Sequence, residues 1–133
     1  MNSYVCPYCR GHLRVGEVIV FLTKTIKGES GLILLSPKIG DYTVITHPSY
    51  NFDSGDHVNF ICPICYENLD AKEYSKNLAK VIMIEEETNR EFAILFSKIV
   101  GEMCTYKVAG GDFQAFGGDS NSYTNFFGEE PKY

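Results

Sequence analysis

Residues 6–9 read CPYC and residues 62–65 read CPIC, so the chain contains the same four-residue pattern twice. Proline fixes φ in a tight turn and removes a backbone N–H that would compete there. A C-x-x-C turn of this kind, called a knuckle below, directs two sulfur atoms at one point. Two knuckles supply four thiolates, which is a ligand set of structural zinc sites. The sequence therefore predicts one structural Zn²⁺ per chain, joining the N-terminal region to the middle of the chain. The predicted ligands are Cys6, Cys9, Cys62 and Cys65.

The two knuckles resemble those of zinc ribbons, which commonly read Cys-Pro-x-Cys-Gly. The resemblance covers the knuckles and the strand that leads into the second one, residues 58–61. The chain departs from the pattern at Arg10 and Tyr66, which stand where glycine is usual. Zinc ribbons separate their pairs by roughly 15–20 residues, and the interval from Cys9 to Cys62 is much longer. We therefore expect a sheet between the knuckles; iron, which four thiolates also suit, stays an alternative to zinc.

Two other interpretations of the cysteines were weighed. CPYC is also the active-site tetrapeptide of glutaredoxins, where it begins a helix after a first strand, but few residues precede Cys6 here. Residues 10–26 contain two glycines and then a β-rich run, so a helix that lowers the thiol pKa is not expected. Residues 1–14 have no apolar signal segment. A cytoplasmic location is therefore expected, and structural disulfides are rare there.

The remaining candidate ligands are weaker. His12, His47 and His57 lie near the knuckles, but four thiolates already complete a tetrahedral site. Cys104 is predicted to be a small buried residue in a strand. A catalytic zinc needs an open coordination position, which four cysteines do not leave. The sequence also lacks the common phosphate-loop, dinucleotide and H-E-x-x-H motifs. We therefore predict that the protein is not an enzyme.

The net charge of the chain indicates which kind of partner the protein binds. The chain has 133 residues and a formal net charge of −5, whereas nucleic-acid binding needs a basic patch. No segment has the roughly 20 apolar residues of a membrane span. The sequence therefore predicts a protein-interaction or regulatory module. Alternatives are a nucleic-acid-binding ribbon and a zinc–thiolate redox switch, in which oxidation of the cysteines expels the metal. The nucleic-acid alternative would use a local basic strip of Arg10, Arg14, Lys24 and Lys27.

The apolar pattern predicts a mainly β fold, with a small α+β fold possible. Short runs rich in β-branched and aromatic residues alternate with turn residues. One helix is expected over residues 70–80, where Asp70 and Glu73 have the spacing of a capping box. A buried helix over 92–100 is an alternative to a strand there. Strands are expected over residues 17–26, 32–36, 42–46, 57–61, 81–85, 91–99 and 103–108.

We expect one zinc-clamped β domain over residues 1–108 and a flexible, aromatic and acidic tail over 109–133. The tail either packs loosely on the sheet or adds to a partner's surface. No internal repeat other than the knuckle pair is evident. The predicted domain consists of the first knuckle (6–9), an antiparallel meander (15–61), the second knuckle (62–65) and a β-hairpin unit (80–108).

Overall fold

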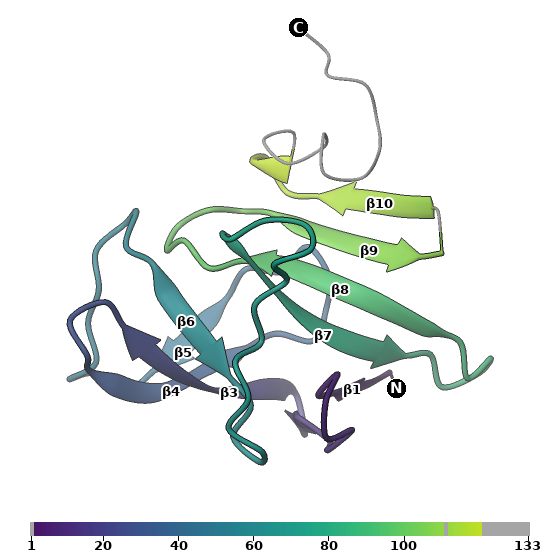
Figure 1. Cartoon of the computed structure of the whole chain (residues 1–133), viewed down its shortest axis with the longest axis horizontal. Helices are drawn as coiled ribbons and strands as arrows, with labels where there is room; N and C mark the ends of the chain where they lie inside the picture. The colour runs from purple at the N-terminus through teal and green to yellow at the C-terminus, as the bar shows by residue number, and fades with distance from the viewer. Residues whose placement is uncertain (1, 111, 121–133) are drawn as a thin grey trace, which may run out of the picture.

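The computed structural model describes residues 2–110 and 112–120, and nearly all of its regular structure is β. Figure 1 shows two antiparallel sheets, with β7–β10 in one and β3–β6 in the other. The first sheet has the order β1-β7-β8-β9-β10; the second has the order β2-β3-β4-β5, and β6 also pairs with β3. The strands are β1 (Ser3–Val5), β2 (Arg14–Val15), β3 (Val18–Thr25), β4 (Ser30–Leu35), β5 (Val44–Thr46), β6 (Val58–Ile61), β7 (Leu78–Ile84), β8 (Glu91–Ser97), β9 (Thr105–Ala109) and β10 (Asp112–Phe116).

The predicted fold class, mainly β, is confirmed. The helix expected over residues 70–80 is wrong. The N–H groups of Tyr74 and Ser75 both donate to the Ala71 carbonyl, at 2.9 and 3.0 Å, which makes a single turn. The Ala71 N–H then donates to Leu78 O at 2.9 Å, where β7 begins. The side chains of Ala71 and Leu78 are both fully buried, so tertiary packing outweighs the local capping signal. The alternative helix over 92–100 is also wrong, because β8 occupies most of it.

The two halves of the chain repeat the same order of strands. The first half of the chain contains β1–β5 and the second contains β6–β9, and each half begins with one strand and a knuckle. Within the first half, Leu35 of β4 lies opposite Ile19 of β3 and Val44 of β5. In the second half, Phe96 of β8 takes the position that Leu35 has in the first half, because it pairs in the equivalent register with β7 and β9. The repeat is therefore one of strand order and register, and it extends well beyond the knuckles.

The two halves exchange their first strands. β1 leads into the first knuckle but pairs with β7 of the second half. β6 leads into the second knuckle but pairs with β3 of the first half. The registers agree: Tyr4 lies opposite Met83, and Phe60, the counterpart of Tyr4, lies opposite Thr23. Each sheet is therefore completed by a strand from the other half, and the chain crosses between sheets at the knuckles.

The main core lies between the two sheets. Alternate residues of β3 and β7 face it, as expected for strands with one buried face. Three phenylalanines join the sheets: Phe21 and Phe60 from one, and Phe96 from the other, with ring centroids 5.0–5.3 Å apart. A smaller apolar cluster, which includes Leu95 and Tyr106, contains only residues of the second half and is packed by Phe113 of β10.

The C-terminal part of the described chain adds to the first sheet. β10 pairs with β9 as the edge strand, and Tyr106 donates a hydrogen bond to the Ser120 carbonyl. The rest of the predicted tail, residues 121–133, lies outside the described residues, so its flexibility stays a prediction. Across residues 2–110 and 112–120, no helix is long and apolar enough to cross a membrane.

Candidate metal centre

The first knuckle is a tight turn that presents two sulfur atoms on one side. It is closed by backbone hydrogen bonds from Arg10 N to Cys6 O and from Cys6 N to Gly11 O, both 3.0 Å. Two further N–H groups point at sulfur: Tyr8 N lies 3.4 Å from Cys6 Sγ, and Gly11 N lies 3.3 Å from Cys9 Sγ. N–H donors aimed at sulfur favour the thiolate, which is the form that binds a metal.

The second knuckle has the same geometry. Tyr66 N donates to Cys62 O at 2.9 Å, and Cys62 N donates to Glu67 O at 3.0 Å. The N–H groups of Ile64 and Cys65 lie 3.3 and 3.4 Å from Cys62 Sγ. Each knuckle therefore follows a strand and closes its turn with a hydrogen bond to the carbonyl of the first cysteine. In each knuckle, backbone N–H groups point at sulfur.

The strand exchange brings the two knuckles together. One potential ligand atom from each predicted cysteine lies within 4.8 Å of all the others. Two short sulfur–sulfur distances join different knuckles: Cys6 to Cys65 at 3.7 Å and Cys9 to Cys62 at 3.8 Å. These distances far exceed a covalent S–S bond of about 2.05 Å. The four thiols therefore form a cluster without disulfides.

The cluster fits a tetrahedral metal ion. A Zn–S bond of about 2.3 Å implies edges of about 3.8 Å between sulfur atoms in a regular tetrahedron. The pairs Cys6–Cys65 and Cys9–Cys62, at 3.7 and 3.8 Å, agree with that edge. Residues close to the cluster support it from outside: Ile64 of one knuckle lies so close to Gly11 of the other that a Cβ at Gly11 would meet its Cδ1 at 2.5 Å. A larger residue at position 11 would therefore require the exposed end of the Ile64 side chain to move.

The pKa values of the cysteine thiols in the cluster shift in different directions. Burial raises the pKa of the Cys6 thiol to about 12, and the neighbouring sulfur atoms add to the rise. Burial also acts against ionisation of Cys62, but N–H donors from Cys65 and Ile64 outweigh it and lower the pKa of Cys62. The backbone of Glu67 stabilises the thiolate of Cys65, yet burial and the Cys62 sulfur raise its pKa overall. Four adjacent thiolates repel one another, and a divalent cation would remove that repulsion and release the protons.

An ion pair connects the first knuckle to the sheet behind it. The Arg10 guanidinium donates two hydrogen bonds to the Glu91 carboxylate, Nη1 to Oε1 at 2.9 Å and Nη2 to Oε2 at 2.7 Å. The hydrogen bond from Arg10 lowers the pKa of Glu91. Arg14 is also engaged: its side chain donates to the carbonyls of Gly16 and Asn2. Two of the four residues in the predicted basic strip are therefore already paired within the chain.

The three histidines and Cys104, which were the weaker candidates from the sequence, are not part of the potential metal-ligand group. His57 Nε2 lies 2.7 Å from Asn77 Oδ1, and His47 Nδ1 lies 2.7 Å from Ser49 Oγ. His12 pairs with Val5 beside the first knuckle. Among the described residues, the potential metal-ligand group contains cysteines only. Cys104 is buried, as expected, although it immediately precedes β9, and burial raises its pKa to about 11.

Comparisons with models of known protein families, with curated proteins and with solved structures find no match to this chain.

Sequence reasoning missed one feature around this centre, the exchange of β1 and β6. Its signal lay in the two segments before the knuckles, residues 3–5 and 58–61, which are both short apolar strands. Pairing partners are set by contacts far apart in the sequence, so the strands alone did not reveal which sheet each one joins.

Proposed function

We propose that this chain is a protein-interaction module whose two knuckles hold one structural zinc ion through Cys6, Cys9, Cys62 and Cys65. The observation that carries the proposal is the meeting of four sulfur atoms from two equivalent knuckles within 4.8 Å. The ion would fix the crossing point of the two sheets. A structural site of this kind can contribute on the order of 10 kcal/mol to folding.

A structural role is favoured over a catalytic one by the ligand set. Four cysteine sulfurs complete a tetrahedral zinc site, whereas catalytic sites keep one position for water or substrate. The N–H donors around Cys6, Cys9 and Cys62 are directed at sulfur, which favours the thiolate form that binds a metal. The proposed role of the metal is therefore to hold the fold.

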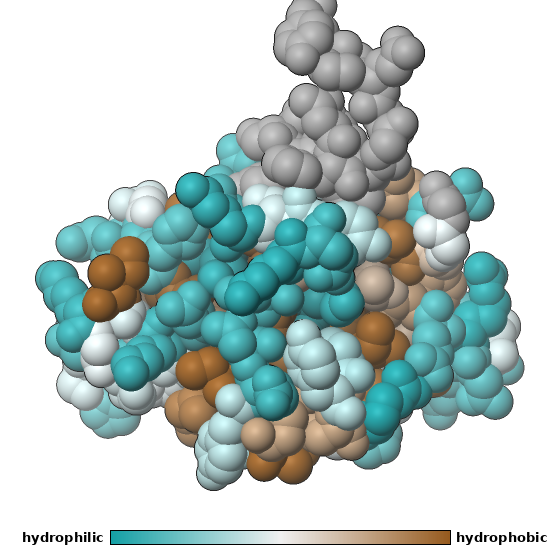
Figure 2. All heavy atoms as spheres, viewed as in Figure 1, coloured by the Kyte–Doolittle hydropathy of each residue, from teal (hydrophilic) through white to brown (hydrophobic). Residues whose placement is uncertain are grey.

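We place the interaction surface on the knuckles themselves. Tyr8, Ile64 and Tyr66 are all more than half exposed and belong to the two turns around the sulfur cluster. Tyrosine is enriched in protein interfaces because it combines a large apolar ring with a polar hydroxyl. The face drawn in Figure 2 is mainly hydrophilic, with hydrophobic residues in small separate areas. A compact contact built on a few aromatic residues suits such a surface better than a broad apolar interface.

A protein partner is favoured over a nucleic acid by charge. The chain carries a formal net charge of −5. The arginine closest to the exposed tyrosines, Arg10, is held by Glu91 in a bidentate ion pair. Phosphate contacts need free basic side chains, and they give a steep dependence of affinity on salt.

The metal is tested by elemental analysis of purified wild-type protein beside Cys62→Ser and Cys104→Ser. We expect one zinc ion per chain in the wild type and in Cys104→Ser, because Cys104 is a buried cysteine outside the cluster. Cys62→Ser should lose most of its metal. Iron in place of zinc would correct the identity of the ion, and equal metal content in all three proteins would refute the site.

The interaction surface is tested by quantitative affinity purification with Tyr66→Ser, with Ile26→Ser as the matched control. The two side chains have similar exposed fractions, 71% and 77%, but Ile26 follows β3, away from the knuckles. A partner that is lost with Tyr66→Ser and retained with Ile26→Ser supports the proposal. Retention on DNA or RNA that falls steeply with salt would favour the nucleic-acid alternative instead.

A further inference from the structure

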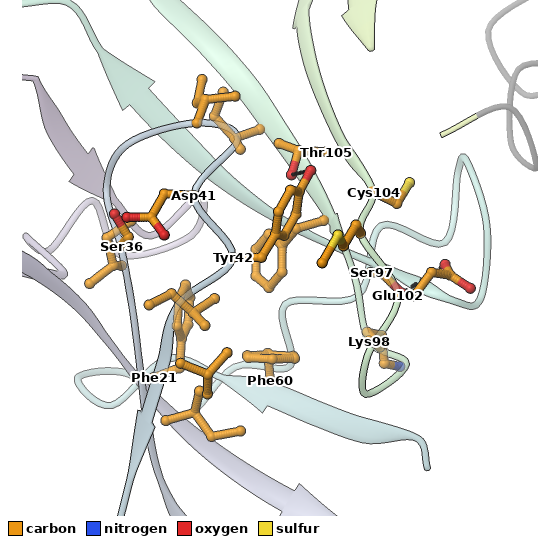
Figure 3. Close-up of a pocket in the computed structure, with 18 of the residues that line it drawn as sticks. Phe21, Ser36, Asp41, Tyr42, Phe60, Ser97, Lys98, Glu102, Cys104 and Thr105 are labelled. Atoms are coloured by element: carbon orange, nitrogen blue, oxygen red, sulfur yellow. Dashed lines mark hydrogen bonds between the residues drawn. The ribbon is translucent and has the colours of Figure 1, made fainter. Parts of the chain in front are cut away.

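A cavity of about 260 Å³ lies between the two sheets, apart from the cysteine cluster. Its floor consists of the phenylalanines that join the sheets, and Phe21 and Phe60 lie at one end of it in Figure 3. Further walls come from aliphatic residues of both sheets, such as Ile33, Val81 and Ile94, all of which are buried. The cavity thus begins in the main core and extends from there toward the surface.

This volume is unusual for a core. Protein interiors are close-packed, with few voids larger than a water molecule. An engineered apolar cavity of about 150 Å³ stays dry and binds benzene, and the cavity here is larger. Side chains that line an unfilled cavity lose the dispersion contacts that a well-packed core provides. A guest molecule would restore those contacts.

The roof of the cavity is made of two equivalent loops from the two halves of the chain. In the first, Lys38 N donates to Ser36 Oγ at 3.2 Å; in the second, Ile99 N donates to Ser97 Oγ at 3.0 Å. Each loop then turns at a glycine with positive φ, followed by an acidic residue. The repeat therefore leaves space where its two copies face each other across the core.

The polar groups around the cavity are arranged for a neutral guest. The Tyr42 hydroxyl donates to Phe116 O at 3.1 Å and lies 3.1 Å from Thr105 Oγ1, and Figure 3 shows this hydroxyl pair beside the cavity. Of the charged residues that line the cavity, Lys38 is exposed at the surface, and the other side chains are engaged elsewhere. Lys98 Nζ lies 2.6 Å from Asp70 Oδ1, and in Figure 3 the Lys98 side chain points away from the cavity.

The carboxylates of the two loops also accept hydrogen bonds from groups within the protein. Asp41 accepts hydrogen bonds from the backbone and hydroxyl of Thr43, and Glu102 accepts one from Ser97 Oγ at 2.9 Å. A charged guest would lose its hydration among the apolar residues of the interior, which is costly.

The cavity reaches the surface at β5. Val44 lines it and is 50% exposed, and Met103, on the other loop, also lines it and is 51% exposed. These two residues mark a route by which a small molecule can enter without separating the sheets.

We propose that this cavity is a binding site for a small, neutral, mainly hydrocarbon molecule about the size of two fused rings. Its rings would contact Phe21, Phe60 and Phe96, and a single polar group would reach the Tyr42–Thr105 hydroxyl pair. The proposal is independent of the protein partner and of the identity of the metal.

The test is a titration of the metal-loaded, full-length protein with 2-naphthol, followed by NMR, with 2-naphthalenesulfonate as the charged counterpart. We expect saturable 1:1 binding of 2-naphthol, with shifts concentrated on residues that line the cavity. The sulfonate should bind at least about tenfold more weakly, because its charge would lose hydration among the mainly apolar residues that line the cavity.

Two variants on one strand give a matched control. Val44→Phe places a ring in the cavity, whereas Ile45→Phe adds the same group to the next residue, which is also 50% exposed but does not line the cavity. Val44→Phe should weaken 2-naphthol binding at least about tenfold, and Ile45→Phe by less than about twofold. Equal effects of the two variants, equal binding of the sulfonate, or wild-type shifts that spread over the surface without saturating would each overturn the proposal. The wild-type shift map provides this test even if Val44→Phe does not fold.

Discussion

Arg10 and Tyr66 adopt the same left-handed backbone conformation, with φ of 62° and 63°, each one residue after the second cysteine of its knuckle. Zinc ribbons commonly place glycine here, and this chain supplies the conformation with ordinary residues. The reason is the hydrogen bond that each N–H makes to the carbonyl of the first cysteine, which closes the turn. A residue with a Cβ is strained in this region by roughly 1–2 kcal/mol.

Tyr66→Gly should therefore stabilise the protein. Tyr66 is largely exposed and loses little packing, so relief of backbone strain should outweigh the greater entropy of glycine in the unfolded chain. We expect a gain of about 0.5–1 kcal/mol in the free energy of unfolding, measured by urea titration of the metal-loaded protein. Tyr8→Gly is the control: Tyr8 lies in the other knuckle without positive φ, so this change should destabilise. A loss of stability in both variants would show that the strain argument is wrong.

Thiol reactivity should separate the exposed cysteine of the cluster from the buried ones. With metal bound, all five cysteines should react slowly with a thiol reagent at pH 8. After removal of the metal with a chelator, the exposed Cys9 should react fast, whereas Cys6 and Cys104 should stay slow, because burial limits access and raises their pKa values to about 12 and about 11. At pH 8 only about one Cys104 thiol in a thousand is then ionised, and this fraction increases about tenfold per pH unit up to the pKa.

Cys104→Ser provides the check on this assignment. The variant should give the same count of fast-reacting thiols as the wild type after chelation. A fast thiol that is lost in Cys104→Ser would contradict the burial of Cys104.

The ion pair of Lys98 and Asp70 should be costly to break from one side. Their charged atoms lie 2.6 Å apart and both side chains are largely buried. Asp70→Asn leaves the ammonium group of Lys98 without its partner, and such changes cost about 3–5 kcal/mol. The double variant Asp70→Asn/Lys98→Met should recover part of that loss.

A more exposed ion pair serves as the comparison for this prediction. Lys80 Nζ and Glu73 Oε1 lie 2.8 Å apart, with the Glu73 side chain 52% exposed. Glu73→Gln should cost no more than about 1 kcal/mol, because exposed pairs contribute little. Urea unfolding of the three variants decides the matter; equal losses for Asp70→Asn and Glu73→Gln would refute the buried role of the first pair.

Removal of the metal should loosen both sheets rather than one. Each knuckle is continuous with a strand that completes the opposite sheet, so the cluster holds the β1–β7 and β6–β3 pairs together. Hydrogen exchange of the chelated protein should therefore show early loss of protection in all four of these strands. The β8–β9 pair, far from the knuckles along the chain, should keep its protection longer. Loss confined to one sheet would contradict this account of the clamp.

The sequence alone predicted the features that are encoded locally. The paired Cys-Pro-x-Cys motifs identified all four cysteines of the cluster, and β-branched runs located most strands to within a few residues. The helix prediction over 70–80 was wrong although Asp70 and Glu73 have capping-box spacing. In the structure each of them pairs with a lysine instead, Lys98 and Lys80 respectively.

The features that escaped prediction depend on distant contacts. The repeat is visible in strand register, but its residues have diverged: Phe60 occupies the place of Tyr4, and Met103 the place of Tyr42. Strand exchange and the cavity both arise from how the halves face each other, and no local pattern specifies that arrangement. Packing, rather than propensity, decides these parts of the fold.

The exchanged strands also define what a shorter ancestor of this fold would look like. If the connection between β5 and β6 were cut, each piece would give its first strand to the other's sheet and two thiolates to a common ion. Two identical copies of one half-length polypeptide would form the same arrangement as a symmetric homodimer, with the metal on its two-fold axis. Gene duplication and fusion would then free the two subunit surfaces to diverge, as Tyr42 and Met103, which both line the cavity, have done.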